Sequence, residues 1–286
     1  MILQQLINGI VIGSVYALIA MGATLVYGIL KVLDIANAGA YAIGAYAGLF
    51  LYQATGSLPV AFLGAVLFTG LFGVLVQRVL YVPLLDKPPL VPLICSIGLF
   101  IFIQDLIRLL AGPHIRAFEA QLPFRGIELP YLSVNAIWIA IMATTAVLLV
   151  FLWYMLNRTK LGLAWKSTAQ DLEIAKAMGV NVDRVVAFNF LLGYGFAAAA
   201  GIMIGMLYNS VFPTMGDMPA YKMLAIIVLG GLGNPLGTVV AGLLIGVVET
   251  LVAGYVGFFL PRDAIAFVVL IVILLVRPQG LLGQRT

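Results

Sequence analysis

The chain is a series of long apolar runs separated by short polar stretches, and this pattern predicts a bundle of membrane helices. Runs close to the ~20 residues needed to cross a bilayer occupy residues 3–27, 38–53, 59–77, 91–111, 134–156, 185–208, 236–254 and 263–276. A shorter run, residues 221–232, would reach only about 18 Å as a helix, less than a ~30 Å hydrocarbon core. We therefore expect one all-α polytopic membrane domain, residues 1–286, with about eight transmembrane helices.

A break in the apolar pattern occurs in each half of the chain, at residues 33–44 and 230–237. Non-helical backbone at membrane depth survives only inside protein or beside a water-filled path. We expect residues 221–254 to enter from the outer side, turn at 230–237 and return, with a cytoplasmic C-terminus. Two interrupted segments in comparable positions also predict inverted repeats around a central site.

The residues at these breaks are the first candidates for a translocation path. They are Asn37 and Gly39 in the first break and Gly231, Gly233 and Asn234 in the second. Each asparagine has two readings. An amide that both donates and accepts suits contact with a passing polar solute, and the same side chain also caps helices.

Lys and Arg residues orient the chain, because they are enriched on the cytoplasmic side of membrane proteins. The first of them, Lys31, follows the first span, so the N-terminus is expected outside. Residues 158–184 carry five Lys and Arg against three acids and are expected in the cytoplasm. Within this loop, residues 169–178 lack Gly and Pro and predict a short helix, capped by Thr168 and ended by Gly179. Such a helix outside the membrane offers a docking surface.

Composition agrees with a membrane class, with 63% hydrophobic and 9% charged residues against about 25% charged in soluble proteins. The single cysteine, Cys95, excludes disulfides and thiolate metal clusters within the chain. No nucleophile–base pair or metal-ligand cluster accompanies it. We therefore expect neither an enzyme nor a cofactor or metal site.

Charges within apolar runs are costly and usually mark pairing or function. Asp105 and Arg108 are spaced to pair on one helix face, and Asp34 is expected to form a solvated interfacial pair with Lys31. Glu249 has no oppositely charged residue nearby in sequence. It is either a buried carboxyl group bonded to a facing helix or part of a gate, and we add it to the candidate path.

Nearly the whole chain resembles the membrane permease subunits of bacterial branched-chain amino acid ABC importers, most of all the H-type of the two paralogous permeases. The resemblance rests on four motifs in this order: NGIVIGSVYALIAMGATLVYGILKVLDIANAGAYAIGAYAG, AQDLEIAKAMGVNVDRV, AIIVLGGLGNPLGTVVAGLLIGVVE and LLVRPQGLLG. The family commonly has Asn-Phe-Ala-His-Gly-Glu where this chain has residues 34–39, which leaves the substrate open.

The resemblance implies a bacterial inner-membrane permease that works with a paralogous permease subunit, two ATP-binding cassette ATPase subunits and a periplasmic substrate-binding protein. This chain has no phosphate-binding loop of its own. By resemblance, the coupling helix that docks on the ATPase includes Ala169, Asp171, Ala177, Met178 and Gly179. Two alternatives remain: a related permease for urea or short amides, and an ion-coupled secondary transporter.

Overall fold

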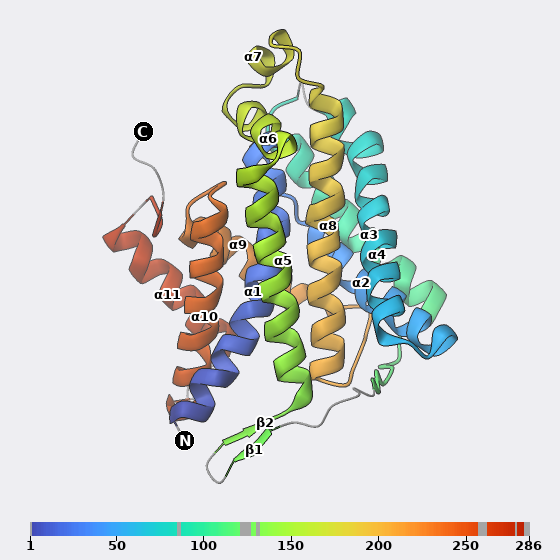
Figure 1. Ribbon diagram of the computed structural model, residues 1–286, viewed down its shortest axis with the longest axis vertical. Coiled ribbons are helices and arrows are strands. Elements are labelled where there is room, and N and C mark those ends of the chain that lie inside the picture. Colours follow the sequence, from blue (N-terminus) through green and yellow to red (C-terminus); the bar gives the residue numbers. More distant parts are fainter. Residues whose placement is uncertain are drawn as a thin grey trace.

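A computed structural model describes residues 2–84, 87–120, 127–129, 132–256, 262–277 and 279–282. The described chain is a bundle of helices that run side by side between two ends (Figure 1). Its long helices are α1 (Ile2–Leu30), α2 (Ala36–Thr55), α3 (Leu58–Val76), α4 (Leu90–Ala111), α5 (Ala136–Arg158), α8 (Val182–Leu207) and α10 (Pro235–Val256). The shorter ones are α6 (Lys160–Gln170), α7 (Leu172–Ala177), α9 (Asp217–Gly230) and α11 (Arg262–Val276).

Two small features interrupt this all-α architecture. A π-helical turn, η1 (Gln77–Tyr81), and a 3₁₀ turn, η2 (Val82–Leu84), extend α3. A two-stranded antiparallel hairpin, β1 (Ile127–Leu129) and β2 (Leu132–Val134), precedes α5. The hairpin and the N-terminus mark one end of the bundle, called here the hairpin end, and α6 and α7 mark the other, called the α7 end (Figure 1).

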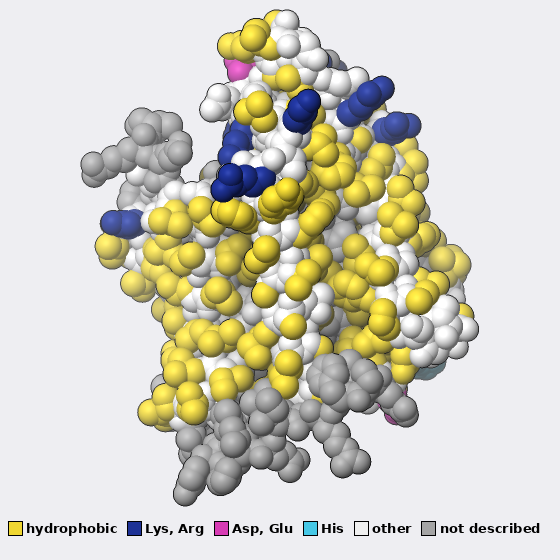
Figure 2. All heavy atoms as spheres, viewed as in Figure 1, with side chains coloured by type: hydrophobic (Ala, Val, Ile, Leu, Met, Phe, Trp, Pro, Cys, Tyr) yellow, Lys and Arg dark blue, Asp and Glu magenta, His cyan; other side chains and the backbone are white. Residues whose placement is uncertain are grey.

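The membrane prediction is confirmed. Within the described residues, six helices are long and apolar enough to cross a bilayer, namely α1, α3 with its extension, α4, α5, α8 and α10. Hydrophobic side chains cover the visible sides of the bundle, and Lys and Arg gather toward the α7 end (Figure 2). This distribution matches a cytoplasmic α7 end, because basic residues favour that side of the membrane.

The helices pack as two inverted repeats, α1–α4 and α8–α11. In this comparison α1 corresponds to α8, α2 to α9 and α3 to α10. The contact of α1 with α10 then corresponds to that of α8 with α3, and the contact of α2 with α8 corresponds to that of α9 with α1. Equivalent helices run in opposite directions, since α1 leads toward the α7 end and α8 leads away from it (Figure 1). The expected repeats are present, but the partner of α2 is α9. Asn37 in α2 and Asn234 before α10 are therefore not counterparts.

The helices α2 and α9 begin together in the middle of the bundle. Gly216, just before α9, lies against the Ala38 carbonyl oxygen in the first turn of α2. From there α2 runs to the hairpin end and α9 to the α7 end (Figure 1). Both helices thus point their N-termini, the positive ends of their dipoles, toward the centre.

The turn between α9 and α10 lies at the α7 end, so its expected position at membrane depth is wrong. Gly233 in this turn lies against Gly28, two residues before the end of α1, and Gly28 in turn contacts Trp165 on α6. The physical reason is that α9 starts at Asp217, earlier than the apolar run suggests, and its 14 residues carry the chain to that end. The break that lies in the middle of the bundle is the first one, before α2.

Asp34 also differs from its expected role, because it is buried rather than solvated. It is 1% exposed, and its two carboxylate oxygens accept hydrogen bonds from the hydroxyls of Tyr81 at 2.7 Å and Tyr194 at 2.9 Å. Lys31 instead donates to the Gly28 carbonyl oxygen. Since the chain turns inward after α1 to start α2, Asp34 enters the bundle and needs donors there. The Asp105–Arg108 pair is confirmed at 2.8 Å on the surface of α4.

We expect cysteine labelling to confirm this topology. In a Cys95→Ala background, an impermeant maleimide should label Lys176→Cys and Leu232→Cys from the cytoplasm only, and Ala54→Cys from outside only. Lys176 is exposed on α7, Leu232 is exposed on the α9–α10 turn, and Ala54 is exposed at the far end of α2. Labelling of Leu232→Cys from outside would contradict the placement of this turn.

Close packing of α1 on α10 gives a second prediction. A Cβ added at Gly246 would stand 2.3 Å from the Gly13 Cα atom, so the two helices touch through backbone. Gly246→Leu should destabilise the protein by about 3 kcal/mol or more, the cost of severe overpacking. Gly98→Leu on α4 is the matched control, because nothing lies within 4 Å of a Cβ there. Thermal unfolding in detergent measures the stability of both variants, and equal unfolding midpoints would contradict the close contact between α1 and α10.

Candidate functional site

A cavity of about 530 Å³ lies in the half of the bundle nearer the hairpin end. It is bordered by α1, α2, the end of α8 with the loop that follows, the start of α9, and α10. The lining residues are Ile12, Val15, Tyr16, Ile19, Tyr41, Ile204, Tyr208, Ser210, Phe212, Met215, Met218, Pro219, Lys222 and Glu249. Such a volume, mostly apolar with a few polar groups, is typical of small-molecule sites.

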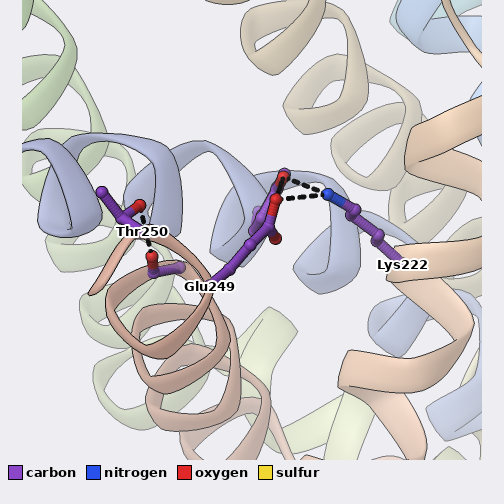
Figure 3. A network of polar contacts seen from close by, with 5 residues as sticks. Lys222, Glu249 and Thr250 are labelled. Atoms are coloured by element: carbon purple, nitrogen blue, oxygen red, sulfur yellow. Dashed lines mark hydrogen bonds and ion pairs between the residues drawn. The ribbon is translucent and has the colours of Figure 1, made fainter. Parts of the chain in front are cut away.

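A buried ion pair stands in the wall of this cavity. The Lys222 Nζ atom on α9 donates to the Glu249 Oε1 atom on α10 at 2.8 Å, and both side chains are almost fully buried (Figure 3). Lys222 also donates to the Tyr16 hydroxyl on α1 at 2.7 Å. The group therefore ties three helices together at the point where they border the cavity.

The pair changes the interpretation of Glu249. The expectation that it bonds to a facing helix is confirmed, but its partner is a cation, 27 residues earlier in the chain. Sequence analysis missed Lys222 because it falls within the short apolar run 221–232. The signal was present: a Lys in one apolar run and a Glu in the next are each too costly to bury alone, so each needs an opposite charge.

The carboxylate of Glu249 is only half satisfied. Its Oε1 atom is within 3.4 Å of the Tyr16 hydroxyl as well as 2.8 Å from Lys222. Its Oε2 atom is buried and has no hydrogen-bond partner among the described residues. The next residue, Thr250, donates to the Gly246 carbonyl oxygen within α10 and takes no part in the pair (Figure 3). An unsatisfied buried oxygen in a native site calls for a missing partner.

Asn37 lies directly behind the cavity, in the middle of the bundle. It is fully buried, and its amide nitrogen donates to the Ile19 carbonyl oxygen at 3.2 Å and to the Met223 sulfur at 3.5 Å. Its Oδ1 atom has no partner among the described residues. The side chain does not cap α2, which has no side-chain cap, so the capping interpretation is wrong for Asn37.

Asn234, in contrast, is a helix cap. Its Oδ1 atom accepts from the Gly237 N–H in the first turn of α10, and its amide donates to the Leu282 carbonyl oxygen. Gly231 and Gly233 have positive φ angles of 99° and 79°, which favour glycine in this turn. These three residues lie at the α7 end, away from the cavity. They shape the turn that links α9 to α10.

Gly39 does not face the cavity either. An added Cβ there would meet the Ile103 side chain on α4 at 2.8 Å, so this glycine allows α4 to pack on α2. Of the six path candidates, the structure therefore puts Glu249 on the cavity and Asn37 behind it. The other four lie elsewhere.

The loop expected in the cytoplasm folds as two helices, α6 and α7, and the sequence-based boundaries of its helix were wrong. Asp171 rather than Thr168 caps α7, accepting from the backbone N–H groups of Glu173 and Ile174. The Thr168 hydroxyl donates to the Ala164 carbonyl oxygen inside α6. Gly179 ends α7 as expected, with a φ of 83°. The Val180 N–H then bonds back to Ala175, as in a Schellman ending.

The expected coupling residues lie at the tip of the α7 end. Ala169 is partly buried at the end of α6, while Asp171, Ala177, Met178 and Gly179 are exposed. Ile174 on α7 and Met178, the residue that follows α7, lie four residues apart, with 63% and 80% of their surface exposed. Nothing in the described chain covers this apolar pair.

Comparison of the sequence with known proteins shows the family to which the chain belongs. The family model described as "Branched-chain amino acid transport system / permease component" matches residues 5–276. The Escherichia coli K12 protein named high-affinity branched-chain amino acid transport system permease protein LivH is 35% identical over 99% of this chain and 96% of its own. The Pseudomonas aeruginosa protein BraD, similarly named, gives the same identity and coverage. A probable permease of this type from Methanocaldococcus jannaschii is 26% identical over 96% of this chain and 91% of its own.

A solved structure shares the fold. PsaBC from Streptococcus pneumoniae in complex with Fab aligns with a TM-score of 0.51 over 96% of this chain and 89% of that chain. The sequence identity is 16%, so the likeness concerns the fold alone.

The two asparagines should respond differently to substitution. Asn234→Ala should cost about 1 kcal/mol through loss of a helix cap, and Asn234→Ser should recover most of it. Asn37→Asp should cost several kcal/mol, because a carboxylate would be buried facing a carbonyl oxygen and a sulfur. Thermal unfolding of the purified chain measures these effects. A smaller loss for Asn37→Asp than for Asn234→Ala would contradict the assignment.

Proposed function

We propose that this chain, which belongs to the family of permease components of branched-chain amino acid transport systems, is the membrane-spanning subunit of an ABC importer for such amino acids. The observation that supports it most is the match of the family over nearly the whole chain, with relatives 35% identical from end to end. The multi-pass bundle and its cytoplasmic helix pair are the parts that this function needs. Its site in the cell is the bacterial inner membrane.

ATP hydrolysis belongs to separate subunits in this proposal. The chain carries no phosphate-binding loop, so two ATP-binding cassette subunits supply the energy. A paralogous permease completes the membrane part, and a periplasmic binding protein delivers the substrate at the hairpin end. The exposed α6–α7 segment is the contact that transmits the ATPase motion to the bundle.

The docking surface has a simple physical basis. Ile174 and Met178 present an apolar patch at the tip of the bundle, and such a patch gains free energy when a partner groove removes it from water. The Asp171 cap and the Gly179 ending keep α7 short and rigid. A rigid helix held against a moving groove passes that motion on to α6, and through α6 to α5 and α8.

The path for the substrate runs from the cavity past Asn37. The cavity lies in the half of the bundle nearer the hairpin end and is large enough for an amino acid, and Asn37 lies behind it where α2 and α9 begin. Its unpartnered Oδ1 atom gives a passing polar group one acceptor. Transient contact of this kind suits a path from which release must be fast.

The ion-coupled alternative has less support. It needs a buried acid that holds a cation, and the acid that borders the cavity, Glu249, is already neutralised by Lys222 at 2.8 Å. A permease for urea or short amides has the same architecture, and only transport measurements separate it from the amino acid importer.

Reconstitution tests the function directly. The chain should be coexpressed with the permease, ATPase and binding-protein genes that flank it and placed in proteoliposomes. Uptake of leucine, isoleucine or valine should require ATP on the cytoplasmic side and persist when ion gradients are collapsed. Uptake driven by a proton or sodium gradient would overturn the ABC assignment, and uptake of urea alone would overturn the assignment of amino acids as the substrate.

Coupling through α7 gives a sharper prediction. Met178→Glu and Ile174→Glu should leave folding unchanged, because both residues are exposed, yet they should reduce substrate-stimulated ATPase activity at least about tenfold by charging an apolar contact. Lys176→Ala, on the same exposed helix, is the matched control and should retain activity. Stimulation that is unchanged in both glutamate variants would contradict docking at α7.

A further inference from the structure

We propose that the Lys222–Glu249 pair is the contact site for both charged ends of a zwitterionic amino acid, and that it makes the cavity selective for ligands with no net charge. This inference rests on the proposed function, because it assumes that an amino acid enters the cavity. It adds the group that recognises the amino acid backbone and the physical rule by which charged amino acids are excluded.

The charges of the cavity wall balance. Among its lining residues, Lys222 is the cation and Glu249 the anion, so the cavity carries no net charge. An ion brought into such a low-dielectric site loses its hydration without gaining a net counter-charge. A zwitterion is different, since its carboxylate can lie beside Lys222 while its ammonium lies beside Glu249. The four charges then alternate in sign, and each has two opposite neighbours.

The hydrogen bonds around the pair suit this arrangement. Glu249 has a buried, unpartnered oxygen, Oε2, that accepts from an ammonium group once the side chain turns this oxygen toward the cavity. Lys222 already bridges two acceptors on different helices, Glu249 Oε1 and the Tyr16 hydroxyl. A ligand carboxylate that replaces one of them keeps the lysine satisfied. The exchange therefore replaces one charge-assisted hydrogen bond of Lys222 with another, and no charged group loses its partner.

The rest of the wall suits an apolar side chain. The other lining residues include aliphatic and thioether side chains from α1, from the loop before α9 and from the first turn of α9, namely Ile12, Val15, Ile19, Met215 and Met218. They offer a hydrophobic surface of adaptable shape, since methionine fits varied partners. A cavity of about 530 Å³ holds a branched-chain amino acid with room for water.

A purely structural role for the pair predicts something different. An ion pair that only joins α9 to α10 would affect stability and would not alter which ligand charge is preferred. Ligand selectivity in the isolated chain therefore separates the two roles. The isolated chain is also free of the binding protein, which would impose a selectivity of its own.

The first measurement uses the unaltered full-length chain in nanodiscs, with binding followed by calorimetry. The ligands are L-leucine, L-leucinamide, which is a cation at about pH 6.5, and 4-methylpentanoate, which is an anion. Leucine should bind roughly 10- to 100-fold more tightly than either analogue, the factor expected when one hydrogen bond to a charged group is lost. This comparison needs no variant and so does not depend on variant folding.

The second measurement shifts the net charge of the cavity. Lys222→Met leaves Glu249 alone, and this variant should prefer leucinamide to leucine. Glu249→Gln leaves Lys222 alone and should prefer 4-methylpentanoate. The double variant Lys222→Met/Glu249→Gln should lose the preference for the zwitterion. Thr250→Val, next to Glu249 but turned away from the pair, is the matched control and should bind like the unaltered chain.

The outcomes are distinct. An inverted charge preference in the two single variants supports the proposal. Equal binding of leucine and its analogues by the unaltered chain, no binding of leucine at all, or unchanged preference in the variants would each overturn it. The proposed function is judged separately, by leucine uptake in the assembled transporter. Uptake that persists while selectivity fails to follow the pair would leave the importer in place and remove only this site.

Discussion

The cost of burying polar groups in a membrane bundle is the constraint on which the rest of this structure depends. Among the described residues, two acidic side chains lie deep in the bundle, and each is compensated from other helices. Asp34 accepts from Tyr81 and Tyr194, and Glu249 accepts from Lys222. Removing any one of these partners would leave a group unsatisfied at a cost of ~1–3 kcal/mol, more if it is charged. The polar contacts therefore specify which helices meet and at what height.

These contacts also explain how the bundle accommodates α2 and α9, two helices that begin in its interior. Asp34 precedes α2, and Asp217 opens α9, so an acid stands at the N-terminal end of each of these helices, where the dipole is positive. The Gln104 amide on α4 donates to Asp217, as the tyrosines do to Asp34. With both N-termini directed at the centre, non-helical backbone is confined to the protein interior, where its polar groups find partners. The cavity and Asn37 lie at this meeting point.

Small residues determine how closely the helices pack. Lipid tails are as apolar as the helix surfaces, so helices associate through close van der Waals packing. Gly13 and Gly246 let α1 and α10 touch through their backbones, and Gly22 and Gly193 do the same for α1 and α8. The central helix α1, part of the first repeat, thus contacts two helices of the second repeat at short range. Any motion passed from α6 and α7 to the bundle reaches the cavity wall through these rigid contacts.

The sequence by itself determined the class of the protein, the bounds of its membrane helices to within a few residues, and the ending of α7 at Gly179. Apolar length and glycine position are local properties, and a single chain displays them directly. Only the tertiary structure decided that Asp34 is buried, that Asn37 is no cap while Asn234 is one, and that Lys222 partners Glu249. It also decided that the partner of α2 is α9. Each of these depends on which distant segments share a depth in the bundle, and depth follows from packing among all the helices, which no local pattern encodes.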